Sequence, residues 1–193
     1  MILYHGTSLH NALQIEEHGF VPDKSYNWEV RSRKGLVYLS LAYAPFYAMN
    51  AKPNSDKGAL IKVDVPKILL LAEDDFIMYA LKKPVYTNAD LKKVDKLIFH
   101  VPQNVEASLK YMGNCAAEPQ DIKILGVRYF GMSNLIMACD PAISPMNYMF
   151  MGEYYRRLSD WIYEGKDALE FAHEYNRTIN EQLEKVSRKG GKK

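Results

Sequence analysis

Three residues that can hold a polar ligand follow one another near the start of the chain, in the segment LYHGTS (residues 3–8). The imidazole of His5 can donate or accept a hydrogen bond near neutral pH. Gly6 has no side chain, so its backbone N–H and C=O can be approached closely, and Thr7 adds a hydroxyl group. Each residue alone would also suit a strand end or a turn.

Two tyrosines follow in a regular order. Tyr38 lies in the apolar segment GLVYLSL (residues 35–41), and Tyr47 lies nine residues later in APFYA. The face of a tyrosine ring attracts a cation or a planar cationic ring. Either tyrosine alone would be a core aromatic in a chain of 14 tyrosines, but the ordered set with His5 favours a binding pocket.

Short strands and helices must position these groups. Residues 1–4 predict a buried strand, and Ser8 suits the N-cap of an amphipathic helix that ends at Gly19. Alternating apolar patterns predict further strands, and patterns of helical period predict helices. The predicted strands are 35–41, 58–66, 114–118 and 122–131; the predicted helices are 42–51, 73–83 and 88–98, and the chain is helical in pattern after about 141.

Three features of this sequence resemble the motifs of the NAD-dependent ADP-ribosyltransferases. They are the HGT segment at a strand end, Tyr38 on a second strand and Tyr47 on the helix after it. The branch is that of diphtheria toxin, the poly(ADP-ribose) polymerases and DarT-type toxins, and the resemblance covers residues 1 to about 130. It implies an α+β fold, an ADP-ribosyltransferase-like split antiparallel β-sheet core (1–140) with NAD in its cleft. Residues 141–193 would form a helical C-terminal extension packed on that core.

The resemblance also implies roles in NAD binding. His5, with help from Thr7, would bind a ribose hydroxyl, and the backbone of Gly6 would meet the nicotinamide carboxamide. Tyr38 and Tyr47 would stack on the nicotinamide ring. The implied NAD-binding set is His5, Gly6, Thr7, Arg33, Tyr38, Ser40 and Tyr47, and the implied catalytic set is His5, Tyr38 and Glu118.

The third catalytic position is open between three residues. The family places a carboxylate at the start of a late strand, where it polarises the attacking nucleophile. Glu118 is the acid on the expected strand and the first choice. Spacing within the family points instead to Asn114, and Glu106 can enter from residues 100–113, which we expect to form a loop facing the acceptor. With Asn114 there, transfer of a single ADP-ribose is favoured over chain building.

Residues 20–34, FVPDKSYNWEVRSRK, show no regular period and mix aromatic with charged side chains. An irregular segment of this length in a compact domain often covers a functional site. We expect it to cover the adenine side of NAD and to contact the diphosphate. The candidate residues are Tyr26, Trp28, Arg31 and Arg33.

Composition and charge narrow the classes of protein to which the chain can belong. The 193 residues carry a net charge of +2, but residues 185–193 hold five basic side chains and no acid, so the remainder is at −3. We expect a disordered basic tail from about residue 187. No segment has the apolar length of a membrane span, and the two cysteines have no metal-ligand spacing. The acids 73–75 suit a helix N-terminus better than a cation site, so no metal is expected.

Apolar residues recur at spacings of three and four between 169 and 186, with one asparagine among them. The pattern is that of a coiled-coil seam shorter than three heptads. Packing on the chain's own domain is the simpler interpretation. The alternative is self-association or the binding of an antitoxin.

The sequence therefore predicts a cytoplasmic mono-ADP-ribosyltransferase that transfers ADP-ribose from NAD to a macromolecule. A nucleic acid, RNA or DNA, is the favoured acceptor, and the expected role is a toxin of a toxin–antitoxin or phage-defence (antiviral) system. The alternatives are a protein-modifying ADP-ribosyltransferase, an RNA 2′-phosphotransferase and a non-catalytic module of the same fold that binds NAD or nucleic acid.

The expected cover gives a first prediction. If residues 20–34 close over NAD, limited proteolysis should cleave this segment more slowly when NAD is added. Mass spectrometry of the fragments measures the effect, with cleavage near residues 185–193 as the internal control. Equal cleavage of 20–34 with and without NAD would contradict the prediction.

Overall fold

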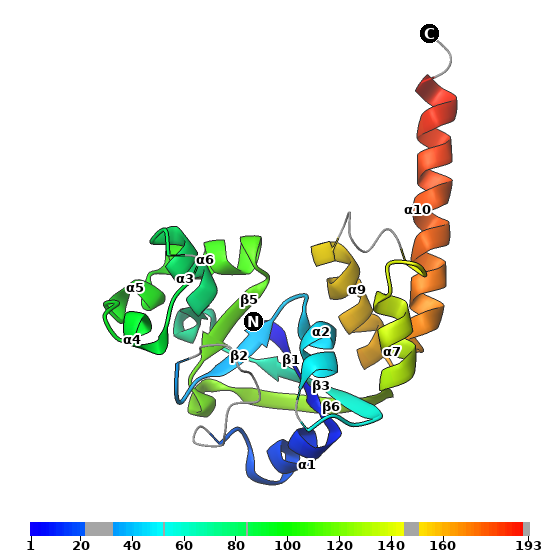
Figure 1. Cartoon of the computed structure of the whole chain (residues 1–193). Helices are drawn as coiled ribbons and strands as arrows, with labels where there is room; N and C mark the ends of the chain where they lie inside the picture. The colour runs from blue at the N-terminus through cyan, green and yellow to red at the C-terminus, as the bar shows by residue number, and fades with distance from the viewer. Residues whose placement is uncertain (22–32, 52, 84, 145–150, 191–193) are drawn as a thin grey trace.

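The computed structural model describes residues 1–21, 33–51, 53–83, 85–144 and 151–190, with backbone alone for 187–190. These residues form an α+β fold around one six-stranded antiparallel sheet with the strand order β4-β5-β2-β1-β3-β6 (Figure 1). Within them, no helix is long and apolar enough to cross a membrane. The strands are β1 (Ile2–Ser8), β2 (Val37–Ser40), β3 (Lys57–Asp64), β4 (Leu71–Ala72), β5 (Asn114–Ala117) and β6 (Lys123–Gly131).

Strand β1 contains the whole HGT segment, which the sequence placed at the end of a shorter strand. It is followed at once by α1 (Leu9–His18). Ser8 is the N-cap, as predicted, because its hydroxyl accepts a hydrogen bond from the N–H of Asn11. Gly19 ends the helix with φ 70°, a conformation that suits glycine. His5 therefore projects from a strand interior.

The two neighbours of β1 hold it very differently. Strand β3 pairs with β1 along its whole length, from Ile2 opposite Asp64 to Ser8 opposite Gly58. Strand β2 pairs with β1 at Tyr4 opposite Ser40. The sequence predicted a split pair of sheets, and the described strands form one sheet whose two halves meet at this narrow junction.

Apolar side chains on the two faces of the sheet form two cores. One contains Leu3, Leu39 and Ile61, and helices α1, α3 (Asp74–Ala80), α5 (Leu97–His100) and α6 (Pro102–Tyr111) contribute to it. The other contains Tyr4 and Leu60, on the opposite face because side chains alternate along a strand. Helices α2 (Ala44–Asn50), α7 (Met132–Cys139), α9 (Met151–Tyr163) and α10 (Ala168–Gly190) form it.

Helix α2 packs directly on β1 at Gly6. A Cβ atom on Gly6 would lie 1.7 Å from the carbonyl oxygen of Ala44 and 3.0 Å from the N of Ala48. Only a residue without a side chain allows this approach. Gly6 is thus required by the fold, in addition to the ligand contact that the sequence suggested.

Several elements differ from the sequence prediction. Residues 100–113, expected as an acceptor-facing loop, contain helix α6, which begins with Pro102 at its first position. The predicted helix 88–98 is two short helices, α4 (Asn88–Leu91) and α5. Strand β4 and helix α7 were not predicted. The segment 22–32, with Tyr26, Trp28 and Arg31, lies outside the described residues.

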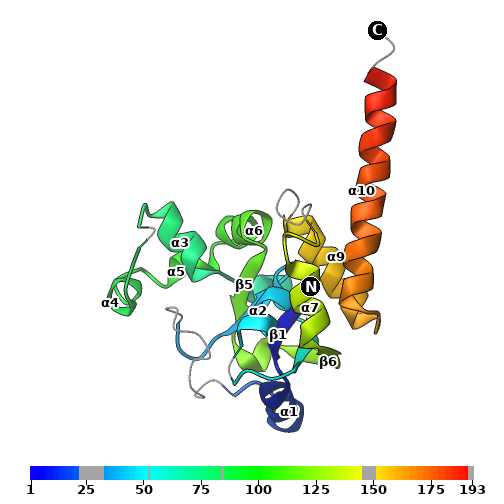
Figure 2. The same ribbon diagram turned by 45° about the vertical axis from the view of Figure 1, so that its right-hand side comes forward.

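Helix α10 contains the 169–186 seam and divides it into two parts. Ala172 and Tyr175 are buried in the second core, and Asn176 donates a hydrogen bond of 2.7 Å to the carbonyl of Ile143. Leu183 and Val186 are 52% and 69% exposed. The C-terminal part of the helix extends beyond the other elements in both views and continues to Gly190 (Figure 2). The first half of the seam therefore packs on the chain's own α7 and α9. The tail, expected to be disordered from about residue 187, is instead helical as far as Gly190.

The close approach at Gly6 gives a second prediction. Gly6→Ala should lower the free energy of unfolding by at least ~3 kcal/mol, because the methyl group meets the backbone of α2, which cannot move aside as a side chain would. Urea unfolding followed by circular dichroism measures it. Gly152→Ala in α9 is the control, since a Cβ there makes ordinary contact with Tyr43, at 3.5 Å. Equal stability of the two variants would contradict the packing.

Candidate functional site

His5 lies at the point where β1 and β2 separate. Its Nδ1 is 3.0 Å from the main-chain carbonyl oxygen of Tyr38, and its ring meets the edge of Phe20 at a centroid distance of 5.3 Å. Burial lowers the pKa of His5, against the opposing effect of the Tyr38 carbonyl. The neutral imidazole must donate from Nδ1 to that carbonyl, which leaves Nε2 as an acceptor. An acceptor nitrogen suits a ligand hydroxyl group.

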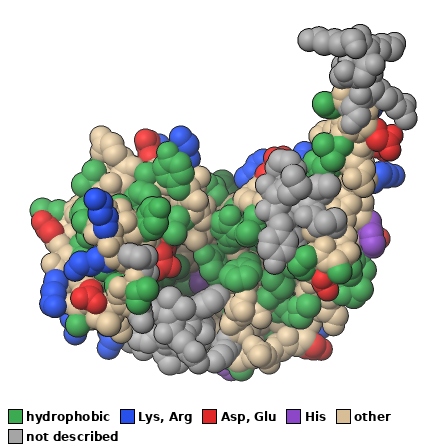
Figure 3. Space-filling view, turned by 45° about the horizontal axis from the view of Figure 1, so that its top comes forward, with side chains coloured by type: hydrophobic (Ala, Val, Ile, Leu, Met, Phe, Trp, Pro, Cys, Tyr) green, Lys and Arg blue, Asp and Glu red, His purple; other side chains and the backbone are tan. Residues whose placement is uncertain are grey.

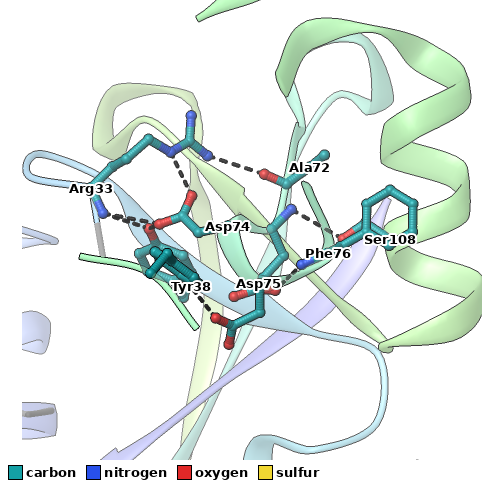
Figure 4. Close-up of polar contacts among 9 residues, drawn as sticks. Arg33, Tyr38, Ala72, Asp74, Asp75, Phe76 and Ser108 are labelled. Atoms are coloured by element: carbon teal, nitrogen blue, oxygen red, sulfur yellow. Dashed lines mark hydrogen bonds and ion pairs between the residues drawn. The ribbon is translucent and has the colours of Figure 1, made fainter. Parts of the chain in front are cut away.

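The Tyr38 side chain is held by a buried ion pair rather than by His5 (Figure 4). Its hydroxyl donates a short hydrogen bond to Asp74 Oδ2 and accepts one of 2.8 Å from the N–H of Arg33. Arg33 Nε donates to Asp74 Oδ1 at 2.6 Å, and Nη2 donates to the carbonyl of Ala72 at 3.0 Å. The guanidinium also stacks 3.7 Å from the centre of the Phe99 ring.

This arrangement fixes the chemical state of Tyr38. Burial, followed by the negative charge of Asp74, raises the pKa of the Tyr38 hydroxyl well above its ordinary value. Tyr38 therefore stays protonated and acts as a donor to Asp74. The Tyr38 hydroxyl group holds β2 and the backbone of Arg33 in position. The contact occupies the hydroxyl group alone, so the expected stacking of the Tyr38 ring on a ligand stays a prediction.

Tyr47 lies beside Asn114, the first residue of β5. Asn114 Nδ2 donates a hydrogen bond of 2.5 Å to the Tyr47 hydroxyl oxygen. Among the described residues, the amide oxygen Oδ1 of Asn114 is buried without a hydrogen-bond partner. Burial and the nearby charge of Glu73 raise the pKa of Tyr47. A buried acceptor without a donor is costly, which makes this position suited to a donor from a ligand.

Two other expected ligand contacts are used within the fold. The Ser40 hydroxyl donates to the carbonyl of Gly113 and accepts from the N–H of Tyr43, at 3.0 and 2.7 Å, which fixes the turn before α2. The Thr7 hydroxyl accepts 3.2 Å from Asn11 Nδ2. Both residues are 1% exposed. Both hydroxyl groups therefore stabilise the fold around the site through these internal hydrogen bonds.

The candidate acids for the third position do not lie with Tyr47. Glu118 is exposed and follows the last residue of β5, so roughly four strand residues, or about 13 Å, separate it from Asn114. Its carboxylate accepts a hydrogen bond from Gln120. Glu106 is exposed on α6 and pairs with Lys67 at 2.7 Å, which lowers its pKa. Of the three candidates, the structure brings Asn114 to Tyr47.

Sequence reasoning did not find Glu73 as a site residue. It assigned residues 73–75 to a helix N-terminus, and this is confirmed, since Glu73 caps α3 and Asp74 and Asp75 occupy its first turn. Only the fold shows that Glu73 is 9% exposed and lies near Tyr47 and Cys115. Nothing in the local sequence signals that proximity.

One face of the molecule is hollowed (Figure 3). In that view hydrophobic side chains line a depression between the lobe of α3 to α6 and the lobe of α9 and α10. In the described part of the chain, no group of three His, Cys, Asp or Glu side chains is arranged to hold a metal ion. In comparisons with protein-family models, curated proteins and solved structures, none matches this chain.

The buried ion pair gives a third prediction. Asp74→Asn should lower the free energy of unfolding by about 3 kcal/mol, because Arg33 and the Tyr38 hydroxyl would lose their charged partner. Urea unfolding at pH 7 measures the change. Glu106→Gln removes an ion pair whose side chains are 60–62% exposed, so screening by solvent should leave the stability nearly unchanged. Similar losses in both variants would contradict the assignment of Asp74 as the internal anchor.

Proposed function

We propose that the chain is a mono-ADP-ribosyltransferase that transfers ADP-ribose from NAD to a macromolecular acceptor and releases nicotinamide. The observation that carries the proposal is the position of His5, whose Nδ1 lies 3.0 Å from the Tyr38 carbonyl oxygen where β1 leaves β2. Its Nε2 can accept a hydrogen bond from a ribose hydroxyl. The resemblance in sequence assigns His5 the same task.

The other groups support this proposal by their positions. In the described residues, β2 pairs with β1 at Tyr4 and Ser40 and not further along β1. The backbone N–H and C=O of Gly6 on that side of β1 can therefore hydrogen-bond a carboxamide. Tyr47 presents a half-buried ring beside the unpartnered amide oxygen of Asn114. Since Arg33 is bonded to Asp74 and Ala72, its part is to hold Asp74 and the Tyr38 hydroxyl in place.

A nucleic acid is the favoured acceptor. Tyr111 at the end of α6 is 71% exposed, and the ammonium of Lys110 lies 5.1 Å from the centre of its ring. An exposed ring with an adjacent cation suits stacking on a base and contact with a phosphate. The 2′-phosphotransferase alternative needs cationic groups for a phosphate, and Arg128 is instead bonded to the carbonyl of Tyr163 at 3.1 Å.

The fourth prediction tests the reaction. Purified protein with NAD and total RNA, single-stranded DNA or cell lysate should release nicotinamide, measured by chromatography, and label one acceptor class with ADP-ribose. His5→Ala should weaken NAD binding about tenfold through the loss of one hydrogen bond, and should slow transfer as well. His10→Ala, at an exposed position of α1, is the matched control and should match the wild type.

The outcomes separate the candidate functions. Label on RNA or DNA supports the favoured acceptor, and label on lysate proteins supports the protein-modifying alternative. Binding of NAD without nicotinamide release would indicate a non-catalytic module. If neither binding nor release is detected, the proposed function is wrong.

A further inference from the structure

Glu73 occupies a buried position between three elements that are distant in sequence. Its N–H donates a hydrogen bond of 3.0 Å to the hydroxyl of Ser108, which is fully buried on α6. The same hydroxyl donates 2.8 Å to the main-chain carbonyl of Asn114. One side chain thus fixes the start of α3 against the start of β5, where Tyr47 from α2 also arrives.

The carboxyl group of Glu73 has an unusual set of neighbours. Among the described residues, it receives hydrogen bonds only from the backbone N–H groups of its own first helical turn, Phe76 at 3.1 Å and Asp75. No described Lys or Arg forms an ion pair with it. Its titratable neighbours are Asp74 and Asp75 on α3, Tyr47 on α2 and Cys115 on β5. Burial and then the charge of Asp75 raise the pKa of Glu73 to about 7.

Capping alone does not account for glutamate here. Serine, threonine, aspartate and asparagine are the preferred N-cap residues, and any of them would satisfy the N–H of Phe76 with less buried polar surface. The adjacent Asp74 shows how this fold compensates a buried carboxylate, with an arginine at 2.6 Å. Glu73 lacks that compensation. Groups of this kind gather at functional sites.

The geometry points to Glu73 as the carboxylate of the transfer reaction, acting beside Tyr47 and Asn114 in the place that the sequence assigned to Glu118. This inference rests on the proposed function. The unpartnered Oδ1 of Asn114 would receive a donor from the bound ligand, and Tyr47 would lie against the nicotinamide side. Glu73 would then face the reacting sugar carbon.

Glu73 serves the step in which the acceptor replaces nicotinamide at C1′ of the ribose. The bond between C1′ of the nicotinamide-side ribose and the nicotinamide nitrogen breaks, and its electron pair leaves with nicotinamide, which becomes neutral. A lone pair of the acceptor forms the new bond to C1′. The proton of that acceptor group passes to the Glu73 carboxylate, which acts as a general base.

The fifth prediction compares Glu73→Gln, Glu118→Gln and the wild type, with Glu170→Gln on the exposed face of α10 as the control. Calorimetry should show that Glu73→Gln binds NAD within about threefold of the wild type, because only a transition-state contact is lost. Its single-turnover rate of ADP-ribose transfer at pH 8 should fall at least ~10²-fold, and Glu170→Gln should retain the full rate. The wild-type rate should rise with pH through about 7 as Glu73 ionises, and Glu73→Gln should lack this rise.

Circular dichroism establishes that each variant is folded. If Glu73→Gln does not fold, Glu73→Asp replaces it, since aspartate caps helices well and withdraws the carboxylate by one methylene. That variant should lose at least about tenfold in rate and keep the rise with pH. A folded Glu73→Gln or Glu73→Asp with the full rate, or loss of transfer in Glu118→Gln instead, would overturn the Glu73 assignment and leave the proposed function standing. A wild type that neither binds NAD nor releases nicotinamide would overturn both.

Discussion

The close contact between α2 and β1 at Gly6 is the constraint on which the rest of the site depends. Because Gly6 has no side chain, the backbone of α2 at Ala44 lies directly on the strand. That position carries Tyr47 to the first residue of β5, where Asn114 meets it. A larger residue at position 6 would move α2 outward and separate Tyr47 from Asn114 while leaving His5 in place on β1.

Two adjacent acids illustrate how environment gives the same carboxyl group two different functions. Asp74 is 1% exposed and bonded to Arg33 and Tyr38, so its charge is matched and contributes to the anchoring of β2. Glu73, the preceding residue, is buried against neutral and acidic groups and keeps its proton up to about pH 7. The first arrangement stabilises the fold. The second arrangement leaves the Glu73 carboxyl group able to gain or lose a proton near neutral pH.

The sequence predicted most of the sheet because its strands carry a clear alternation, as at Leu60 to Asp64, or a dense apolar run, as around Tyr38. It missed β4 because two residues show no period, and it missed α6 although Pro102 is a typical first helical residue. The order of His5, Tyr38 and Tyr47 was visible in the sequence. The convergence of Glu73 with Ser108, 35 positions apart, is a product of tertiary packing that local sequence does not encode.

The narrow junction between β1 and β2 also divides the hydrogen-bond ladder of the sheet into two halves. Strands β1, β3 and β6 are tied together along nearly their full lengths, and β2, β5 and β4 form the other half of the sheet. Ladder hydrogen bonds joining the halves are concentrated at Tyr4 and Ser40, so amide protons on either side can exchange with solvent through separate local openings. A small ligand seated at this junction would bridge the two halves of the sheet and slow both openings at once.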